Sequence, residues 1–315
     1  MKTSKILTMS VALLGVIAFS SCSSDDEVRT TNDGVVRFTT SIDETATPGT
    51  PQTKAAGTGW TAGDAIGIFM VANGGTTVVE NATNRKYTTT GTSTFTAASG
   101  QNIYYPMDGS AVDFIAYYPY SGSVTALSAT IQVNVAGTQT ATSQADIDLL
   151  WAKTNNGGAG YDKVSHATTP VALAFDHKLS KLVINCKADA NVGVSLNGMT
   201  VSITGMDTKN TLTLSSGVLG TASTVAAITP NKQASAPAGF STSYDAIILP
   251  KAYAADVVEV LFTLSNGEPF VWKVPAITFV SGTEYTYEIN LTRTGVQFTG
   301  TIKPWLTGGG TGIAE

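Results

Sequence analysis

The feature of this sequence that most restricts its fold is a long series of short, apolar-rich segments separated by glycine-rich turns. In the first half these segments lie at 35–42, 65–71, 86–90, 93–97, 102–105, 112–119 and 130–135. In the second half they lie at 171–175, 178–186, 199–204, 211–214, 244–250, 257–264, 269–275, 284–291 and 296–302. Short segments of this kind, bounded by turn residues, are typical of β-strands. The pattern predicts an all-β protein built as a sandwich or barrel.

The composition favours the same fold class. Of the 315 residues, 43% are hydrophobic, 8% are aromatic and only 13% are charged. Threonine and serine dominate the polar positions. Threonine is β-branched and suits a pleated, half-solvated surface. A helical protein would instead show faces rich in Glu, Lys, Arg and Ala.

The segment 154–170 divides the predicted strands into two groups. It lacks apolar periodicity and is rich in glycine and asparagine, which is typical of a loop. Each group contains about seven or more strands, the size of a Greek-key sandwich. We therefore predict an N-terminal domain over 35–165 and a C-terminal domain over 166–315. One short helix is expected within 143–153, with Ser143 as its cap.

The N-terminus resembles a secretory signal peptide. Two lysines among the first five residues precede an apolar run over 6–19 and small residues before Cys22. The run is too short for a membrane span, which needs about 20 residues. Cys22 resembles the acylated cysteine of a bacterial lipoprotein box, although Phe19 stands where the box usually has leucine. We predict removal of 1–21 and lipidation of Cys22; the alternative is a plain signal peptide with an incidental cysteine.

A polar and acidic stretch over 22–34 follows and is predicted to be a solvated tether. Its Ser-Ser-Asp-Asp-Glu run resembles the export signal of surface lipoproteins in Gram-negative anaerobes. This resemblance implies a surface-exposed lipoprotein of the cell outer membrane, because several acyl chains anchor stably. With Cys22 acylated, Cys186 is the remaining cysteine, so no intrachain disulfide can form. Its apolar neighbours predict a buried hydrophobe.

Charge and motif content argue against nucleic-acid binding and against catalysis. The formal net charge is −5 and no basic run is present, whereas phosphate binding needs clustered Lys and Arg. His177 follows Asp176, but no Ser or Cys lies in a nucleophile elbow, so a structural histidine is favoured. Asp146 and Asp148 offer too few oxygen ligands for a divalent ion and are predicted to be solvated or helix-capping. We predict no enzyme, no cofactor and no metal site.

Seven short motifs follow one another along the chain. They are WTAGDAIGIF (60–69), YYPY (117–120), DLLWA (148–152), FDHKLSKL (175–182), IILP (247–250), YTYEINL (285–291) and IKPW (302–305). Their identity and order resemble fimbrillin-like proteins, which are the type V pilins and related surface lipoproteins. The resemblance spans 35–305 and implies two tandem transthyretin-like β-sandwich domains. It also implies assembly into a fimbria after a surface protease trims the N-terminus.

The same resemblance implies a cleavage site after the first strand. In fimbrillins a trypsin-like cysteine protease cuts at an arginine in the loop that follows this strand. The matching loop here holds Lys54 followed by Ala55, among small residues that give a protease access. An arginine-only protease would not cut after lysine, so Arg29 and Arg37 are alternatives, and a plain loop is another.

Removing the first strand would uncover an apolar groove and an unpaired sheet edge, which a strand from another subunit can fill. The side chains predicted to leave are Val36, Phe38 and Ile42. The donor strand is predicted within 296–305, with Val296, Phe298 and Ile302 on one face. The sequence thus predicts a fimbrial subunit, or an accessory or tip adhesin, whose partners are other fimbrial subunits. A glycan-binding surface lipoprotein that does not polymerise is the alternative.

Overall fold

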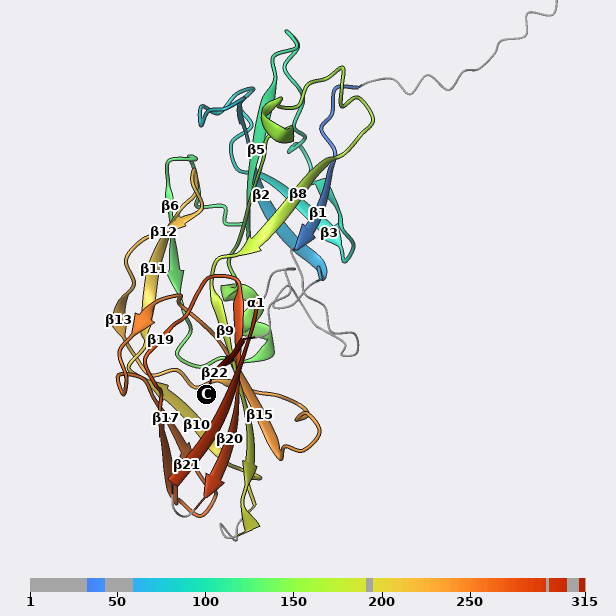
Figure 1. Ribbon diagram of the computed structural model, residues 1–315. Helices are drawn as coiled ribbons and strands as arrows, with labels where there is room; N and C mark the ends of the chain where they lie inside the picture. The colour runs from blue at the N-terminus through green and yellow to red at the C-terminus, as the bar shows by residue number, and fades with distance from the viewer. Residues whose placement is uncertain (1–32, 43–58, 191–194, 293–294, 305–311, 315) are drawn as a thin grey trace, which may run out of the picture. The chain divides into compact units, whose positions relative to one another are not determined.

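The computed structural model describes residues 33–42, 59–190, 195–292, 295–304 and 312–314 (Figure 1). Its regular structure is almost entirely strand. The described part holds one α-helix, α1 (Ala141–Ile147), and one short 3-10 turn, η1 (Asn156–Gly158). The predicted all-β class is therefore confirmed.

Seven strands close into a barrel. They are β1 (Phe38–Ile42), β2 (Ala62–Ala72), β3 (Arg85–Thr90), β4 (Thr94–Ala97), β5 (Val112–Tyr118), β7 (Leu150–Thr154) and β8 (Val171–His177). Around the barrel the order is β1-β4-β3-β2-β5-β7-β8, and β8 closes the ring by pairing with β1. The closing pair is parallel, whereas the other pairs are antiparallel. A closed ring leaves no free edge, so every strand in it is paired on both sides.

The remaining described strands form open sheets. The largest follows the order β14 (Asn231–Lys232), β15 (Thr242–Ile248), β9 (Ser180–Ala188), β20 (Thr283–Thr292), β21 (Gly295–Pro304) and β22 (Gly312–Ala314). A three-stranded sheet follows the order β10 (Thr200–Thr204), β17 (Glu259–Thr263) and β18 (Pro269–Lys273). Strand β11 (Asp207–Thr213) pairs with β12 (Val218–Leu219), β13 (Ser223–Val225) and β6 (Thr130–Asn134). Finally, β16 (Ala252–Tyr253) pairs with β19 (Ile277–Thr278).

Two hydrophobic cores are formed, one inside the barrel and one among the other sheets. Strand β5 contributes to both, and all seven of its residues are buried. Phe114, Ala116 and Tyr118 belong to the barrel core. Ile115 and Tyr117, which alternate with them, belong to the second core. Because successive side chains of a strand point to opposite faces, β5 is covered on both sides.

The sheets do not divide where the sequence analysis places the domain boundary, between residues 165 and 166. Strand β8 lies after this point but pairs with β1 and β7 of the barrel. Strand β6 lies before it but pairs with β11 through five residue pairs. The tandem transthyretin-like arrangement and its domain bounds stay predictions.

The expected short helix is present, but it begins earlier than predicted, at Ala141. Its N-cap is Thr140, and Ser143 is the third helical residue; the two form a reciprocal capping box. The assignment of Ser143 as the cap was therefore wrong by three positions. The end of the segment in which the helix was expected belongs instead to β7, which pairs with β5 and β8.

Candidate functional site: the closing segment of the barrel

Residues 36–42, here called the closing segment, comprise β1 and the two residues before it. Val36 and Phe38 are each 1% exposed and Ile42 is 5% exposed, and all three belong to the barrel core. The predicted burial of these side chains is therefore observed. Residues 39 and 41 face outward, as the two-residue period of a strand requires. The closing segment therefore contributes one of the inner faces of the barrel.

Phe38 is the central side chain of this packing. Its ring makes edge-to-face contacts with Tyr87 and Phe114, with 5.1 Å between ring centroids in each case. The Tyr87 hydroxyl in turn accepts a hydrogen bond from the Ile103 backbone N–H at 3.0 Å. Burial raises the pKa of Tyr87 to about 12, so this hydroxyl stays protonated at neutral pH. Ile103 is in turn held by the closing segment, because the Val36 backbone N–H donates to its carbonyl at 2.9 Å.

The backbone of the closing segment is hydrogen-bonded on both sides. Thr40 N–H donates to the Ser93 carbonyl at 2.8 Å, next to β4. On the opposite edge, Val171 N–H of β8 donates to the Arg37 carbonyl at 2.8 Å. Residues 38–42 pair with 171–175 without a register shift. Removing the segment would thus break two ladders and leave two unpaired strand edges.

Thr40 is an inward-facing residue that the sequence analysis did not select. It is 7% exposed, and its hydroxyl donates to the Ser93 carbonyl at 3.1 Å. The alternation of Val36, Phe38 and Ile42 already implies a fourth inward position between the last two. A pattern of apolar side chains does not mark this position, because threonine is polar.

Arg37 lies on the outer side of the closing segment and forms an ion pair with Asp33 at 2.9 Å. The pKa of Asp33 is lowered, chiefly because the Val35 backbone N–H donates to its carboxylate and further because Arg37 lies beside it. The Arg37 carbonyl is held by β8. Arg37 is thus a poor alternative cleavage site in the folded chain, because a protease needs an accessible, unpaired backbone.

A shallow cleft lies at the end of β1 where the chain leaves the barrel. It is lined by Thr40, Ser41, Ile42, Gly59, Trp60, Gly91, Thr92 and Ser93. The half-buried ring of Trp60 makes edge-to-face contacts with Phe95, Tyr118 and Phe175, at centroid distances of 4.9, 5.5 and 5.5 Å. Trp60 thus covers this end of the barrel core.

Several predicted site residues lie outside the described residues. They are the lipidation site Cys22, the processing site Lys54–Ala55, and the alternative cleavage residue Arg29. The signal peptide and most of the tether lie there too. These assignments stay predictions.

The predicted donor residues lie on β21, which pairs antiparallel with β20. Val296 is opposite Leu291, Phe298 is opposite Ile289, and Ile302 is opposite Tyr285. The Ile302 side chain is half-buried against the second core, while 295–298 are described by their backbone alone. In this state β21 is a member of its own subunit's sheet. Its role as a donor stays a prediction.

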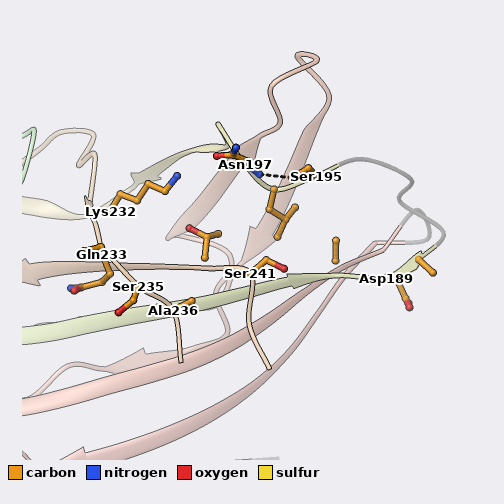
Figure 2. A pocket seen from close by; sticks show the side chains of 13 residues that line it. Asp189, Ser195, Asn197, Lys232, Gln233, Ser235, Ala236 and Ser241 are labelled. Carbon is orange, nitrogen blue, oxygen red and sulfur yellow. Dashed lines mark hydrogen bonds between the residues drawn. The ribbon is translucent and has the colours of Figure 1, made fainter. Parts of the chain in front are cut away.

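A polar pocket lies near the end of β9 and is the second candidate site (Figure 2). Figure 2 shows Asp189 at one end and Lys232 at the other, with Ser195, Asn197 and Ser241 between them. None of the residues that line it is aromatic. A sugar-binding groove commonly presents a ring for stacking. Among the described aromatic side chains, Tyr104 is the most exposed, at 50%. The glycan-binding alternative stays a prediction.

His177 is buried and contacts Asp148 rather than its neighbour Asp176. The distance between His177 Nδ1 and Asp148 Oδ1 is 2.9 Å, and both side chains are fully buried. Asp148 is the C-cap residue of α1 through its backbone N–H, which donates to the Gln144 carbonyl, and its side chain is buried rather than solvated. Asp146 is exposed. The His177–Asp148 pair ties the helix to β8 as a structural contact.

The remaining observations concern the cysteine, possible metal ligands and possible membrane helices of the described residues. Cys186 is buried, as predicted, and burial raises the pKa of its thiol to about 12. Within the described ranges no three His, Cys, Asp or Glu side chains gather as a metal ion would require. No helix in that part of the chain is long and apolar enough to cross a membrane.

Comparison with known proteins identifies the family. The fimbrillin-like family model matches residues 53–305. The chain is also similar to Fim1C of Bacteroides uniformis, which is named as a candidate fimbrium subunit. The two are 35% identical over 325 aligned residues, which cover 96% of this chain and 97% of the relative. The chain therefore belongs to the fimbrillin-like family.

Solved structures show the same fold. A candidate cell adhesion protein from Bacteroides uniformis is 33% identical with a TM-score of 0.68, over 87% of this chain and 100% of that chain. A candidate cell adhesion protein from Bacteroides ovatus is 22% identical with a TM-score of 0.68, over 87% and 99% of the two chains. The second likeness concerns the fold alone.

Proposed function

We propose that this protein is a fimbrial subunit of the cell surface, of the shaft or an accessory or tip adhesin, and that it assembles by donor-strand exchange. In this proposal the chain is cut between Lys54 and Ala55, and the closing segment leaves the barrel. The C-terminal strand of another subunit then takes its place. The observation that carries the proposal is the position of β1, which completes both the hydrogen-bonded ring and the core.

The energetics of the closing segment support this mechanism. Val36, Phe38 and Ile42 each contribute about 1.5–3 kcal/mol by burial. These values are upper estimates, because the unfolded chain already buries part of this surface. A whole domain is stable by only about 5–15 kcal/mol. A chain that loses the segment must therefore accept a replacement strand, unfold or aggregate.

The proposal places the precursor on the outer membrane. Acyl chains on Cys22 anchor it there, and a trypsin-like surface protease releases the rest of the chain by cutting after Lys54. The similar proteins are named as a fimbrium subunit and a cell adhesion protein, which supports a surface location. The role is structural, and the partners are other fimbrial subunits.

The processing step is tested by determining the N-terminus of the surface-exposed chain by mass spectrometry. We expect it to begin at Ala55. Lys54→Gln should leave the precursor uncut, and Lys54→Arg should restore cutting. A mature chain that begins elsewhere, or that forms equally in Lys54→Gln, would contradict the assignment.

The assembly step is tested independently of the natural protease. A full chain whose residues 50–56 are replaced by a site-specific protease sequence is cut and examined by size-exclusion chromatography. We expect monomers before cutting and oligomers afterwards. Deletion of 296–315 should remove the oligomers. If the cut chain loses its N-terminal segment yet stays monomeric and soluble, donor-strand assembly is wrong for this protein.

A further inference from the structure

The closing segment and the C-terminal strand have nearly the same sequence. Residues 36–42 read Val-Arg-Phe-Thr-Thr-Ser-Ile, and residues 296–302 read Val-Gln-Phe-Thr-Gly-Thr-Ile. Four of the seven positions are identical, and they include every large apolar residue of the closing segment. The three that differ are small or polar in the C-terminal copy.

Three of the four identical positions are ones that the barrel core buries. The barrel core buries residues 36, 38 and 42, and the C-terminal strand supplies Val, Phe and Ile at the corresponding positions. The outward residues of the closing segment, Thr39 and Ser41, correspond to Thr299 and Thr301. A strand of this sequence would therefore present the same apolar face inward and a polar face outward.

We infer that a second copy of this chain supplies the donor strand and that residues 296–302 enter in the direction and register of residues 36–42. The inference rests on the proposed function. Val296 then occupies the site of Val36, Phe298 that of Phe38, and Ile302 that of Ile42. The entering strand runs parallel to β8 and antiparallel to β4, as β1 does.

The opposite direction is excluded by the place of the glycine. With the strand reversed over the same seven positions, Gly300 falls on the site of Phe38 and Phe298 falls on that of Thr40. A glycine would leave a large cavity beside Tyr87 and Phe114, which contact the Phe38 ring. A phenylalanine would be forced into the space of a threonine that is 7% exposed.

Other registers fail for related reasons. A slip of one residue turns Gln297, Thr299 and Thr301 toward the core. A slip of two residues places either Gly300 or Val296 on the site of Phe38. The register that copies the closing segment is the one that keeps a phenylalanine between Tyr87 and Phe114.

The single inward difference, Gly300 for Thr40, has an explanation in the strand's own subunit. Gly300 lies opposite Tyr287 of β20. A Cβ atom at Gly300 would lie 2.9 Å from Tyr287 Cε1, so only glycine fits without displacing that ring. The packing of β21 against β20 therefore explains why this position holds glycine instead of the threonine of the closing segment.

A second copy is the partner because donor sequence and acceptor site occur in one chain. A chain that carries both makes head-to-tail contacts, and such contacts extend into open filaments when they do not close into a ring. No second subunit type is needed for this contact.

The register is tested with cysteine pairs in the full chain that carries the engineered cleavage sequence. In the intact chain Thr39 lies opposite Thr94 of β4, and Thr94 is exposed. The inferred register places Thr299 of the second copy opposite Thr94. After cutting, we expect Thr94→Cys with Thr299→Cys to give an intermolecular disulfide ladder on non-reducing gels. The uncut chain should give none, because Thr39 occupies the site.

The matched control is Thr94→Cys with Thr301→Cys, which moves the second cysteine two residues along the same outward face. A disulfide needs Cα atoms about 4.4–6.8 Å apart, so this pair should link several-fold less. The register would be overturned, with strand exchange intact, if oligomers form but the control pair links to the same extent as the first pair. The same holds if oligomers form and neither pair links. A disulfide between positions 94 and 299 within one monomer would overturn the second copy as partner. A cut chain that forms no oligomers would overturn the proposed function itself.

Discussion

Two segments of nearly the same sequence lie in different surroundings in this protein. The closing segment 36–42 lies in a closed barrel between antiparallel β4 and parallel β8. Its counterpart 296–302 lies on β21 in an open sheet, between β20 and β22. The comparison shows that nearly the same strand sequence can pair with different neighbours, so the local sequence alone does not determine the sheet to which a strand belongs. Under the proposed strand exchange, the C-terminal segment would occupy both kinds of surroundings in turn.

The two sheets differ in how much of their strand pairing depends on the shared segment. If β21 leaves its sheet, β22 loses its partner and β20 becomes an edge strand, but the sheet from β14 to β20 stays continuous. If β1 leaves the barrel, the ring opens and both β4 and β8 lose a partner. The barrel should therefore be far more sensitive than the open sheet to changes in its copy of the shared sequence.

The largest expected effect is that of Phe38→Ala in the intact chain. It removes the ring between Tyr87 and Phe114 and should lower the free energy of unfolding by about 3–5 kcal/mol. Urea unfolding measures this change. Ser41→Ala, on the exposed face of the same strand, is the control and should stay within about 0.5 kcal/mol. Equal effects of the two variants would show that β1 does not hold the barrel together.

The next prediction compares Ile42→Ala with Ile302→Ala, which change the same residue type in the two copies. Ile42 is 5% exposed and should cost about 2–5 kcal/mol when truncated. Ile302 is half-buried at the second core, so its truncation should cost clearly less. Thermal unfolding of both variants under the same conditions tests the ranking. The reverse ranking would contradict the comparison.

A third prediction separates assembly from stability. Phe298→Ala should leave the uncut chain monomeric but weaken association of the cut chain by about 10- to 100-fold, the equivalent of about 1.5–3 kcal/mol of lost burial. Sedimentation of the cut chain at several concentrations measures the change. Gln297→Ala is the control, because the inferred register turns it outward. Unchanged association in Phe298→Ala would remove this side chain from the contact.

A smaller effect is expected from Thr40→Gly, which gives the closing segment the glycine of its counterpart. The change removes the hydrogen bond to the Ser93 carbonyl and the restraint of a side chain, at a cost of about 1–2 kcal/mol. Thr40→Ser retains the hydroxyl and should recover part of the loss. Chemical denaturation distinguishes them, and equal stability of Thr40→Gly and wild type would show that this hydrogen bond contributes nothing.

The smallest effect concerns Arg37→Ala, which removes an exposed ion pair with Asp33. The folded-state pKa of Asp33 is lowered, so its contribution is present above the unfolded pKa and is lost as pH falls through the folded value. In Arg37→Ala the pKa should rise only partway, because the Val35 N–H still donates to the carboxylate. NMR titration of Asp33 tests this, and a complete return to the ordinary value would contradict that order of causes.

The local part of this architecture could be predicted from the sequence. Glycine-rich turns and alternating residues located most strands, and alternation placed Val36, Phe38 and Ile42 on one buried face. The same alternation places Thr40 on that face too, but a pattern of apolar residues does not mark it because threonine is polar.

The long-range part could not be predicted in this way. Residues 38–42 pair with 171–175, more than a hundred positions along the chain, and no local pattern records such a partner. For the same reason β8 appeared to belong to the second group of strands. The contact between His177 and Asp148 was missed because the adjacent Asp176 suggested a nearer partner, whereas Asp176 lies 3.5 Å from Lys178.

The ladders on both edges of β1 have a mechanical consequence. Cross-strand hydrogen bonds run roughly across the strand axis. A pull along that axis loads all of them in shear, so that they must fail together, whereas a pull across the strand would open them one after another. A strand held between these two ladders is therefore most resistant to tension applied along its own length. Under the proposed strand exchange, a donor strand held by the same two ladders would resist tension along its axis in the same way.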